Sequence, residues 1–568
     1  MGDTGVSVQA VIINMKTAVA RMEGRVIGPI MTRTTGRRSG RATLMRVFIR
    51  FVRRRLRPGV ALPAAIAGVT GVVAALYYHR MGLTLSHYDA RGHLVVARRI
   101  VDSVTPGWQQ IGAVWLPLPH LLNVLPVQLD FFYRTGASAV AISIISFVAA
   151  AGAIAWMVIA ITESALAALA AASVFILNPN VVYLQSTPMT ELPFMALMTI
   201  AVAMLIEEVE EAGLGGGAGR AASKSSEARR SHATGVAFAL ACLTRYEAWP
   251  VTATALALTV WALWRGGAQL LQALRRVSAI ALLPAIACIG FVIFSRVVIG
   301  EWFVASGFFV PENKARGDLW MAVKEIAWGA QMLSSPPLMW LGAAGLCISL
   351  GLAVGWVPRL GVRLGAEVAA SRRVAAVLTI ALLGTAATPL VAFYIGHPFR
   401  IRYMVPLVAA QAIGVGVAAG AFRRARAPAA MAAAVLAAVT LRPLDRSAAM
   451  VVEAQWDRPN VSSRARVTAC LGPPQPGDKI MASMGSLGHY MQEASQAGFA
   501  LRDFLHEGNG DIWLAAIDGP RPFARWVLIE EKAEGGDFLA HVAREHPHFL
   551  DGYLRVCEGA GLALYRRE

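Results

Sequence analysis

Charged residues are scarce in this sequence, and cysteines are scarcer still. Asp, Glu, Lys and Arg make up only 15% of the 568 residues, whereas 56% are hydrophobic, which excludes an ordinary soluble domain. The five cysteines include no Cys-x-x-Cys spacing, so we expect no zinc site built from thiolates. Apolar segments of roughly 20 residues recur along the chain, and each is long enough to cross a bilayer as a helix. The sequence therefore predicts an α-helical polytopic membrane protein.

Acidic residues are in short supply, with 35 Asp and Glu against 53 Lys and Arg, so the net charge is +18. Much of the excess lies in residues 1–58, where Lys16 and twelve arginines face only Asp3 and Glu23. This segment fits a basic cytoplasmic arm beside anionic membrane lipid. A tail that binds nucleic acid is the alternative, but neither aromatic interleaving nor a known motif accompanies the arginines. We expect no cleavable signal peptide, because the first long apolar run begins near residue 59 and has the length of a span.

Eleven apolar spans are predicted, and the segments between them differ in charge. With the basic arm inside, the internal connections carry arginine pairs such as Arg229-Arg230 and Arg275-Arg276, as the positive-inside rule requires. An odd number of spans places the C-terminus outside, and the Ala/Arg-rich composition points to a bacterial cytoplasmic membrane. The spans lie near residues 59–79, 137–160, 165–182, 192–206, 233–247, 249–264, 277–299, 338–357, 374–394, 403–421 and 428–441.

Residues 59–441 thus form a transmembrane domain, and residues 442–568 form an external domain large enough for its own core. A disulfide is permitted outside the cytoplasm, so a bridge between Cys470 and Cys557 is a hypothesis for this domain. Strand-like and helical patterns alternate in it and predict a small α/β fold. The strand-like runs are Lys479–Met484, Arg525–Glu530 and Gly561–Tyr565, and the helical patterns lie near Leu487–Ala497 and Gly536–Glu545.

Ionisable residues gather in the five loops predicted on the external side. Such groups are expensive at a membrane edge unless they are paired or used, so their convergence on one face predicts a functional site. The first external loop holds Asp89 and two predicted interfacial helices, an amphipathic one over Tyr88–Val104 and an apolar, proline-opened one from Trp115 to about Leu129. The other external residues are Arg91, His93, Arg98 and Arg99, then Glu191, then Arg245, Tyr246 and Glu247, then Glu312, Asn313, Lys314 and Arg316, and finally His397, Arg400 and Arg402.

The order and sidedness of these motifs resemble the C-type (GT-C) membrane glycosyltransferases, and most nearly glycosyltransferase family 39, the protein O-mannosyltransferase and aminoarabinose transferase group. The likeness runs from about residue 60 to the C-terminus. Glu191 stands where Asp is common in the family, and Ala90 follows Asp89 where some members have a second acid, so the subfamily and its metal use stay open. The stretches that carry the likeness are Asp89 with Trp115–Leu122, Asn178–Pro193, Leu240–Tyr246, His397–Pro406, Gly488–Tyr490 and Ala500–Asp503.

The resemblance implies transfer of a sugar from a polyprenyl-phosphate carrier to an external acceptor, which is a protein, a lipid or a glycan. Asp89 is the candidate base, because a carboxylate must take the proton of the attacking hydroxyl or amide. Arg402 is the first candidate for the lipid phosphate, with Arg245 and Arg400 as helpers. Glu191 is expected to orient Asp89, the acceptor or a divalent ion. One base and a phosphate leaving group need no covalent intermediate, so we expect inversion.

The same residues have purely structural interpretations. Glu191 can cap the helix that begins at Leu192, Arg245 can pair with Glu247, and the two later arginines can be interfacial. His93 follows Asp89 by one helical turn and can help bind a metal, or it can be an ordinary surface histidine. A divalent metal held by Asp89, Glu191 and His93 is compatible with the sequence but not required. Further candidates are Glu247, Tyr403 and Lys314, whose loop begins at Phe308 and is either a lid or a membrane anchor.

Other functions remain open at this point. A transporter or flippase would place ionisable residues near mid-membrane and show paired internal repeats, and this chain shows charges at one face and no convincing repeat. A non-catalytic scaffold whose external domain binds a partner is another possibility. Only the charged cluster itself argues against it. An oligosaccharyltransferase is disfavoured, because the external domain lacks the tryptophan-rich acceptor motif expected of that group.

Overall fold

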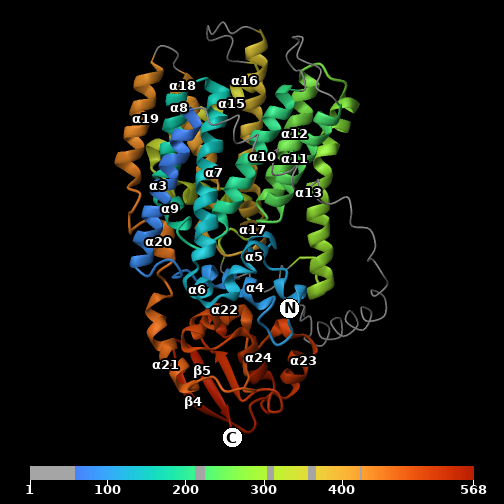
Figure 1. The fold of residues 1–568 in the computed structure, drawn as a ribbon, viewed down its shortest axis with the longest axis vertical. Coiled ribbons are helices and arrows are strands. Elements are labelled where there is room, and N and C mark those ends of the chain that lie inside the picture. The colour runs from blue at the N-terminus through green and yellow to red at the C-terminus, as the bar shows by residue number, and fades with distance from the viewer. Residues whose placement is uncertain (1–57, 212–223, 304–312, 356–365, 422–424) are drawn as a thin grey trace.

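The computed structural model describes residues 58–211, 224–303, 313–355, 366–421 and 425–568. They form a tall helical bundle with a small sheet-containing domain at one end (Figure 1). The predicted basic arm up to residue 57 and the Phe308–Glu312 part of the fourth external loop lie outside the described residues.

Each of the eleven predicted spans coincides with a helix or with a short run of helices. Seven segments are long and apolar enough to cross a membrane by length and composition, among the residues that the structure describes. They are α3, α7, α10, α13, α15, the α16–α17 segment and the segment that ends with α18, whereas α8 and α19 are apolar but shorter. The polytopic helical fold is therefore confirmed, and the count of eleven is not. The bounds are α3 Pro58–Arg80, α7 Ala137–Thr162, α8 Ala165–Ile176, α9 Pro179–Leu184, α10 Glu191–Glu211, α11 Lys224–Cys242, α12 Ala248–Arg265, α13 Leu270–Ile299, α14 Leu319–Met332, α15 Pro336–Ala353, α16 Ala366–Ile380, η4 Ala381–Ala386, α17 Ala387–Ile395, η5 Ile401–Met404, α18 Leu407–Ala421 and α19 Arg426–Leu441.

Small residues let neighbouring helices approach closely in the bundle. Gly345 of α15 faces Gly414 of α18, and a Cβ on either glycine would overlap the backbone of the other helix. Close packing of small residues is a main source of helix association in membranes, where lipid is as apolar as the side chains. The Ala- and Gly-rich sequence of α18 thus serves packing, and nearly all of this helix is buried.

The first external loop departs from the predicted pair of long interfacial helices. Its first helix, α4, spans only Tyr88–Arg99. The second predicted segment, from Trp115 to about Leu129, is broken at Pro126 into two short pieces, because a proline cannot continue a helix hydrogen-bond ladder. All residues from Asp89 to Arg98 are buried, because α4 lies between the bundle and the C-terminal domain (Figure 1). The pieces after α4 are η1 Trp108–Ile111, α5 Leu118–Asn123, η2 Pro126–Gln128 and α6 Asp130–Thr135.

The C-terminal region contains a five-stranded sheet of order β2-β1-β3-β5-β4. Strand β1 pairs in parallel with β2 and β3, whereas β3–β5 and β5–β4 are antiparallel. The three predicted strand runs correspond to β1, β3 and β5. Strands β2 and β4 were not predicted, because β2 has two residues and β4 has few buried side chains. Cys470 of α21 and Cys557 of β4 are joined by a disulfide. The elements are α20 Ala449–Glu453, η6 Arg458–Asn460, α21 Val461–Leu471, β1 Ile480–Ala482, α22 Met484–Ala494, η7 Ser495–Ala497, η8 Leu501–Asp503, β2 Phe504–Leu505, η9 Glu507–Asn509, α23 Asp511–Asp518, β3 Trp526–Glu530, η10 Ala533–Gly535, α24 Phe538–Glu545, β4 Tyr553–Gly559 and β5 Leu562–Arg567.

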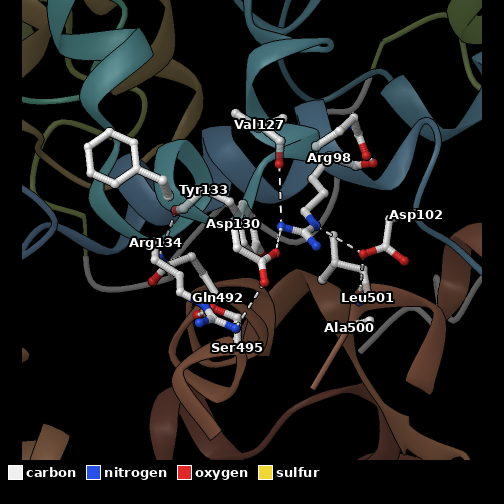
Figure 2. A network of polar contacts seen from close by, with 12 residues as sticks. Arg98, Asp102, Val127, Asp130, Tyr133, Arg134, Gln492, Ser495, Ala500 and Leu501 are labelled. Atoms are coloured by element: carbon white, nitrogen blue, oxygen red, sulfur yellow. Dashed lines mark hydrogen bonds and ion pairs between the residues drawn. The ribbon is translucent and has the colours of Figure 1, made fainter. Parts of the chain in front are cut away.

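The C-terminal domain packs directly on the loop that carries α4. Leu94 and Val95 of α4 share one hydrophobic cluster with side chains of α22 and the sheet. Figure 2 shows the polar contacts beside this cluster, centred on Arg98. Its guanidinium donates to Asp102 at 3.0 Å and to Asp130 at 2.8 Å, and Asp102 also accepts from the Leu501 amide of the C-terminal domain at 3.2 Å. The end of α4 is thereby held by a domain whose Leu501 follows Asp102 by 399 residues.

Candidate functional site

Asp89 and Arg402 form a buried ion pair. Asp89 lies in the first turn of α4, where its backbone amide donates to the Nδ1 atom of His87 at 3.1 Å. Arg402 lies on η5, a short 3₁₀ turn in which its side chain is buried. Burial raises the pKa of Asp89, but the Arg402 guanidinium, through its charge and its hydrogen bond, outweighs burial and holds the pKa at about 2. Asp89 is thus fully ionised at neutral pH and, in this state, is a weak base.

A second buried charge cluster surrounds Arg245, in the loop between α11 and α12. Its guanidinium donates to Glu191 at 2.8 Å and to Glu247 at 2.6 Å, and a further bond to the Thr190 hydroxyl measures 3.0 Å. Glu191 opens α10 and is fully buried. Its Oε2 atom has no hydrogen-bond partner among the described residues. The pairing of Arg245 with Glu247 and the place of Glu191 at a helix start both agree with their structural interpretations.

The two clusters are neighbours. Arg402 interacts electrostatically with both Asp89 and Glu191, and His93 interacts with Asp89, Arg402 and Arg245. The structure therefore brings together residues from α4, α10, the α11–α12 loop and η5, which the sequence predicted to converge. The site lies at the bundle end that meets the C-terminal domain (Figure 1).

Arg400 differs from the other two arginines because it has no carboxylate partner within the described part of the chain. It is half-buried just before η5, and its charge acts on Tyr88 and His397. Tyr403 lies beside the same groups: its hydroxyl is 3.3 Å from His397 Nε2, and the Arg402 guanidinium lies 5.5 Å from the centre of its ring. Of the three candidate arginines, Arg400 is thus the one without an ion pair to a carboxylate in the described residues.

His93 is not the surface histidine that the sequence allowed. It is buried, its Nδ1 atom lies 3.0 Å from Nε2 of His120, and its ring centre lies 4.3 Å from that of Trp115. Gly92 makes room for this indole, since a Cβ there would lie 2.8 Å from it. Burial holds the pKa of His93 well below its ordinary value, so the imidazole is neutral. His120 was missed because its Trp-Leu-Pro-Leu-Pro-His motif gave no reason to pair it with α4.

No group of three or more His, Cys, Asp or Glu lies close enough to hold a metal ion among the described residues. The predicted metal set of Asp89, Glu191 and His93 therefore does not converge as ligands here, since both carboxylates face arginines. Lys314 is also apart from the cluster: it is exposed, and its charge acts on Glu325 of α14. Its loop nevertheless touches the His397 loop, where the Gly317 amide donates to the Tyr394 carbonyl at 2.8 Å.

No model of a protein family and no curated protein sequence matches the chain. Solved structures do match: the chain superposes with a TM-score of 0.50 on ArnT from Cupriavidus metallidurans bound to undecaprenyl phosphate. The two are 14% identical over 88% of this chain and 97% of ArnT, which is a GT-C aminoarabinose transferase. The chain has the GT-C glycosyltransferase fold. Apo ArnT matches with a TM-score of 0.46. An oligosaccharyltransferase of Archaeoglobus fulgidus matches with a TM-score of 0.45, at 12% identity over 83% of this chain and 68% of that one.

The GT-C fold confirms the architecture that the motifs resembled. The individual roles of Asp89, Glu191, Arg245 and Arg402 stay predictions, because a likeness at this level of identity concerns the fold alone.

Proposed function

We propose that this GT-C protein is a membrane glycosyltransferase that takes a sugar from a polyprenyl-phosphate donor and passes it to an external acceptor, a protein, lipid or glycan. The observation that carries the proposal is the buried pair of Asp89 and Arg402, a carboxylate and a cation at one point of a glycosyltransferase fold. The undecaprenyl phosphate in ArnT supports a polyprenyl-phosphate donor. We place the C-terminal domain on the external side of a bacterial cytoplasmic membrane and the N-terminus in the cytoplasm.

The pairing suggests how the donor activates its own base. With Arg402 alongside, the pKa of Asp89 is about 2, too low for efficient proton abstraction near neutral pH. A donor phosphate competes for the Arg402 guanidinium, which binds phosphate oxygens through two parallel N–H groups. As Arg402 turns to the phosphate, Asp89 loses its strongest counter-charge and its pKa rises. The base is then strongest when the donor is bound.

The chemical step is a single displacement. A lone pair on the acceptor oxygen or nitrogen forms a bond to the anomeric carbon while the bond from that carbon to the phosphate oxygen breaks. Asp89 takes the acceptor proton, and polyprenyl phosphate leaves with the bonding electron pair. Arg402 stabilises the negative charge that develops on the leaving phosphate, and Arg400, which has no carboxylate partner in the described residues, is the second cation for it. The anomeric configuration inverts, because one displacement occurs.

Arg245 has a different task in this scheme. Its guanidinium is held by Glu191 and Glu247, so it is less free to bind phosphate than Arg400. We infer that Arg245 fixes Glu191, whose unpartnered Oε2 atom is available to an acceptor hydroxyl or amide. Glu191 therefore orients the acceptor in the proposal, and Arg245 orients Glu191.

A donor screen tests the proposed function. Membranes with and without the protein are incubated with a panel of polyprenyl-phosphate sugars, and the products are identified by mass spectrometry. We expect transfer from at least one donor in membranes that contain the wild-type chain, and none with Asp89→Asn, which should still insert normally. Asp445→Asn is the matched control, because this partly exposed carboxylate bonds only its neighbour Ser447 among the described residues. Full activity of Asp89→Asn would remove the mechanism, and the absence of transfer from every donor would remove the function.

A further inference from the structure

The short helix α20 lies against the start of α4, although 360 residues separate them. The Ser86 hydroxyl donates to the Ala454 carbonyl at 2.6 Å. On its other side, the Met450 amide donates to the Asn180 side chain at 2.9 Å, at the start of α9. Helix α20 is thus fixed between the Asn-Pro-Asn motif of the bundle and the residues that precede Asp89.

His87 connects α20 to Asp89. It is the N-terminal cap of α4, where its Nδ1 atom accepts the hydrogen bond from the Asp89 amide. Because Nδ1 accepts, the proton of a neutral imidazole must lie on Nε2. That atom faces the Oε1 atom of Glu453, the last residue of α20, at 3.5 Å.

His87 and Glu453 are both buried, so their polar atoms cannot bond to water instead of to each other. The side chains of His87 and Glu453 are 0% and 2% exposed. Neither His87 Nε2 nor Glu453 Oε1 has a hydrogen-bond partner among the described residues, and buried polar groups are normally paired. A distance of 3.5 Å is longer than an ideal hydrogen bond, but each atom is the other's available partner.

We propose that Glu453 is a positioning residue that acts on Asp89 through His87. Glu453 holds the imidazole proton on Nε2, which keeps the Nδ1 lone pair on the Asp89 amide and fixes the first turn of α4. The same ring stacks on Tyr88, with 4.7 Å between ring centres. The side chain that serves as base in the proposed reaction is thereby held from the C-terminal side of the chain. This inference rests on the proposed function, since it concerns the role of Asp89 in that reaction.

The contact is one of several that join α4 and its flanking residues to the C-terminal region. Arg91 pairs with Glu493 of α22, and Asp102 accepts from Leu501 beyond the helix end (Figure 2). Of these, Glu453 is the one that faces His87, the residue that accepts the hydrogen bond from the Asp89 amide. Its effect should therefore fall on the chemical step rather than on the docking of the domain.

Four variants separate this role from a general structural one. Glu453→Ala removes the acceptor, whereas Glu453→Gln keeps an oxygen that can accept from His87. His87→Asn keeps a good helix cap for the Asp89 amide but is too short to reach Glu453. Asp445→Asn is the control, because it changes a partly exposed carboxylate in the segment before α20.

We expect Glu453→Ala and His87→Asn each to lower kcat by about tenfold with the donor KM unchanged, since small misplacements of a reacting group cost up to about 100-fold. The double variant should be no slower than either single one, because both break the same connection. Glu453→Gln should stay within about threefold of the wild type. A Glu453→Ala enzyme with wild-type kcat, or losses that multiply in the double variant, would overturn the proposal.

Hydrogen exchange gives a readout that needs no activity. Amides of residues 86–92 should exchange faster in Glu453→Ala than in the wild type or Asp445→Asn, while those of α22 stay unchanged. Equal exchange at residues 86–92 would overturn the positioning role even if transfer is observed. A wild-type protein that transfers no sugar would instead contradict the proposed function, and faster exchange in the variant would still report the connection from Glu453 to α4.

Discussion

The ion pairs of the candidate site and the Arg276–Glu227 pair at the opposite end of the helical bundle differ in exposure. At the end that meets the C-terminal domain, the Arg402–Asp89 side chains are 11% and 8% exposed, and those of Arg245 and Glu191 are 11% and 0% exposed. At the opposite end of α10 and α11, the side chains of Arg276 and Glu227 are 34% and 43% exposed. Exposed pairs contribute about 0–1 kcal/mol, and buried pairs often cost more in desolvation than they return.

The exposure of an ion pair indicates whether its charges need a functional explanation in this chain. An ion pair in contact with water at the membrane edge needs no functional explanation, because water solvates both charges. A buried pair is poor evidence for stability, so its presence needs another reason, and a site that must bind phosphate and move a proton supplies one. Breaking pairs at the two ends should therefore have effects of very different size and kind.

The largest effect on stability should come from Arg245→Met. It leaves Glu191 and Glu247 as buried carboxylates without a cation, which costs about 3–5 kcal/mol. The free energy of unfolding in detergent measures this change. The triple variant Arg245→Met, Glu191→Gln, Glu247→Gln should recover most of the stability and none of the transfer activity. Recovery of activity as well would mean that this cluster serves structure alone.

Arg402→Ala should act next most strongly, and on the donor. A hydrogen bond to a charged group contributes about 1.5–3 kcal/mol, so the donor Kd should rise by about 10- to 100-fold. Arg316→Ala is the matched control, because this exposed arginine lies in the 313–318 loop, which touches the His397 loop. Isothermal titration with a polyprenyl phosphate measures both. An unchanged Kd in Arg402→Ala would remove the phosphate role and with it the proposed release of Asp89.

The sequence predicted which residues converge at this site, but it did not predict most of the contacts between them. Counting spans and arginine-rich connections put Asp89, Glu191, Arg245 and Arg402 on one face, because sidedness depends on local composition. The pairing of Arg245 with Glu247 was also predictable, since only Tyr246 separates them. The contact of Asp89 with Arg402 spans more than 300 residues, and it follows from where η5 enters the bundle, which no local pattern encodes.

Other features of the structure could not be predicted from the sequence, because they also depend on contacts between distant segments. Glu453 lies in a polar stretch after the last predicted span, and only the return of α20 to the bundle brings it to His87. The amphipathic pattern of α4 indicated a helix correctly, but the pattern alone did not reveal that the C-terminal domain covers its outer face. The broken second segment was visible in Pro119 and Pro126, whose effect on a helix is predictable.

A smaller effect is expected in the pH dependence of turnover. The profile of kcat/KM reports the free protein and that of kcat reports the donor complex. Asp89 has a pKa of about 2 in the free protein, so its acid limb should appear in kcat at a higher pH than in kcat/KM. Coincident limbs would contradict the exchange of Arg402 between Asp89 and phosphate.

The same lowered pKa fixes the sign of the contribution of Asp89 to stability. The folded-state pKa lies below the value of 3.8 for an unperturbed aspartate, so the contribution is present above pH 3.8 and is lost as the pH falls toward 2. Asp89→Asn should remove this part of the acid unfolding curve. A curve with the same slope between pH 4 and pH 2 in the variant and the wild type would show that the pair with Arg402 does not persist in solution.

The smallest effect should come from Arg276→Met at the opposite end of the bundle. Its partner Glu227 is partly exposed, and water can solvate that carboxylate when the guanidinium is removed, so the change in the free energy of unfolding should stay below about 1 kcal/mol. Transfer activity should be unchanged. A loss comparable to that of Arg245→Met would mean that burial does not distinguish the two ends, and the main physical reason for locating the site at Asp89 would be lost.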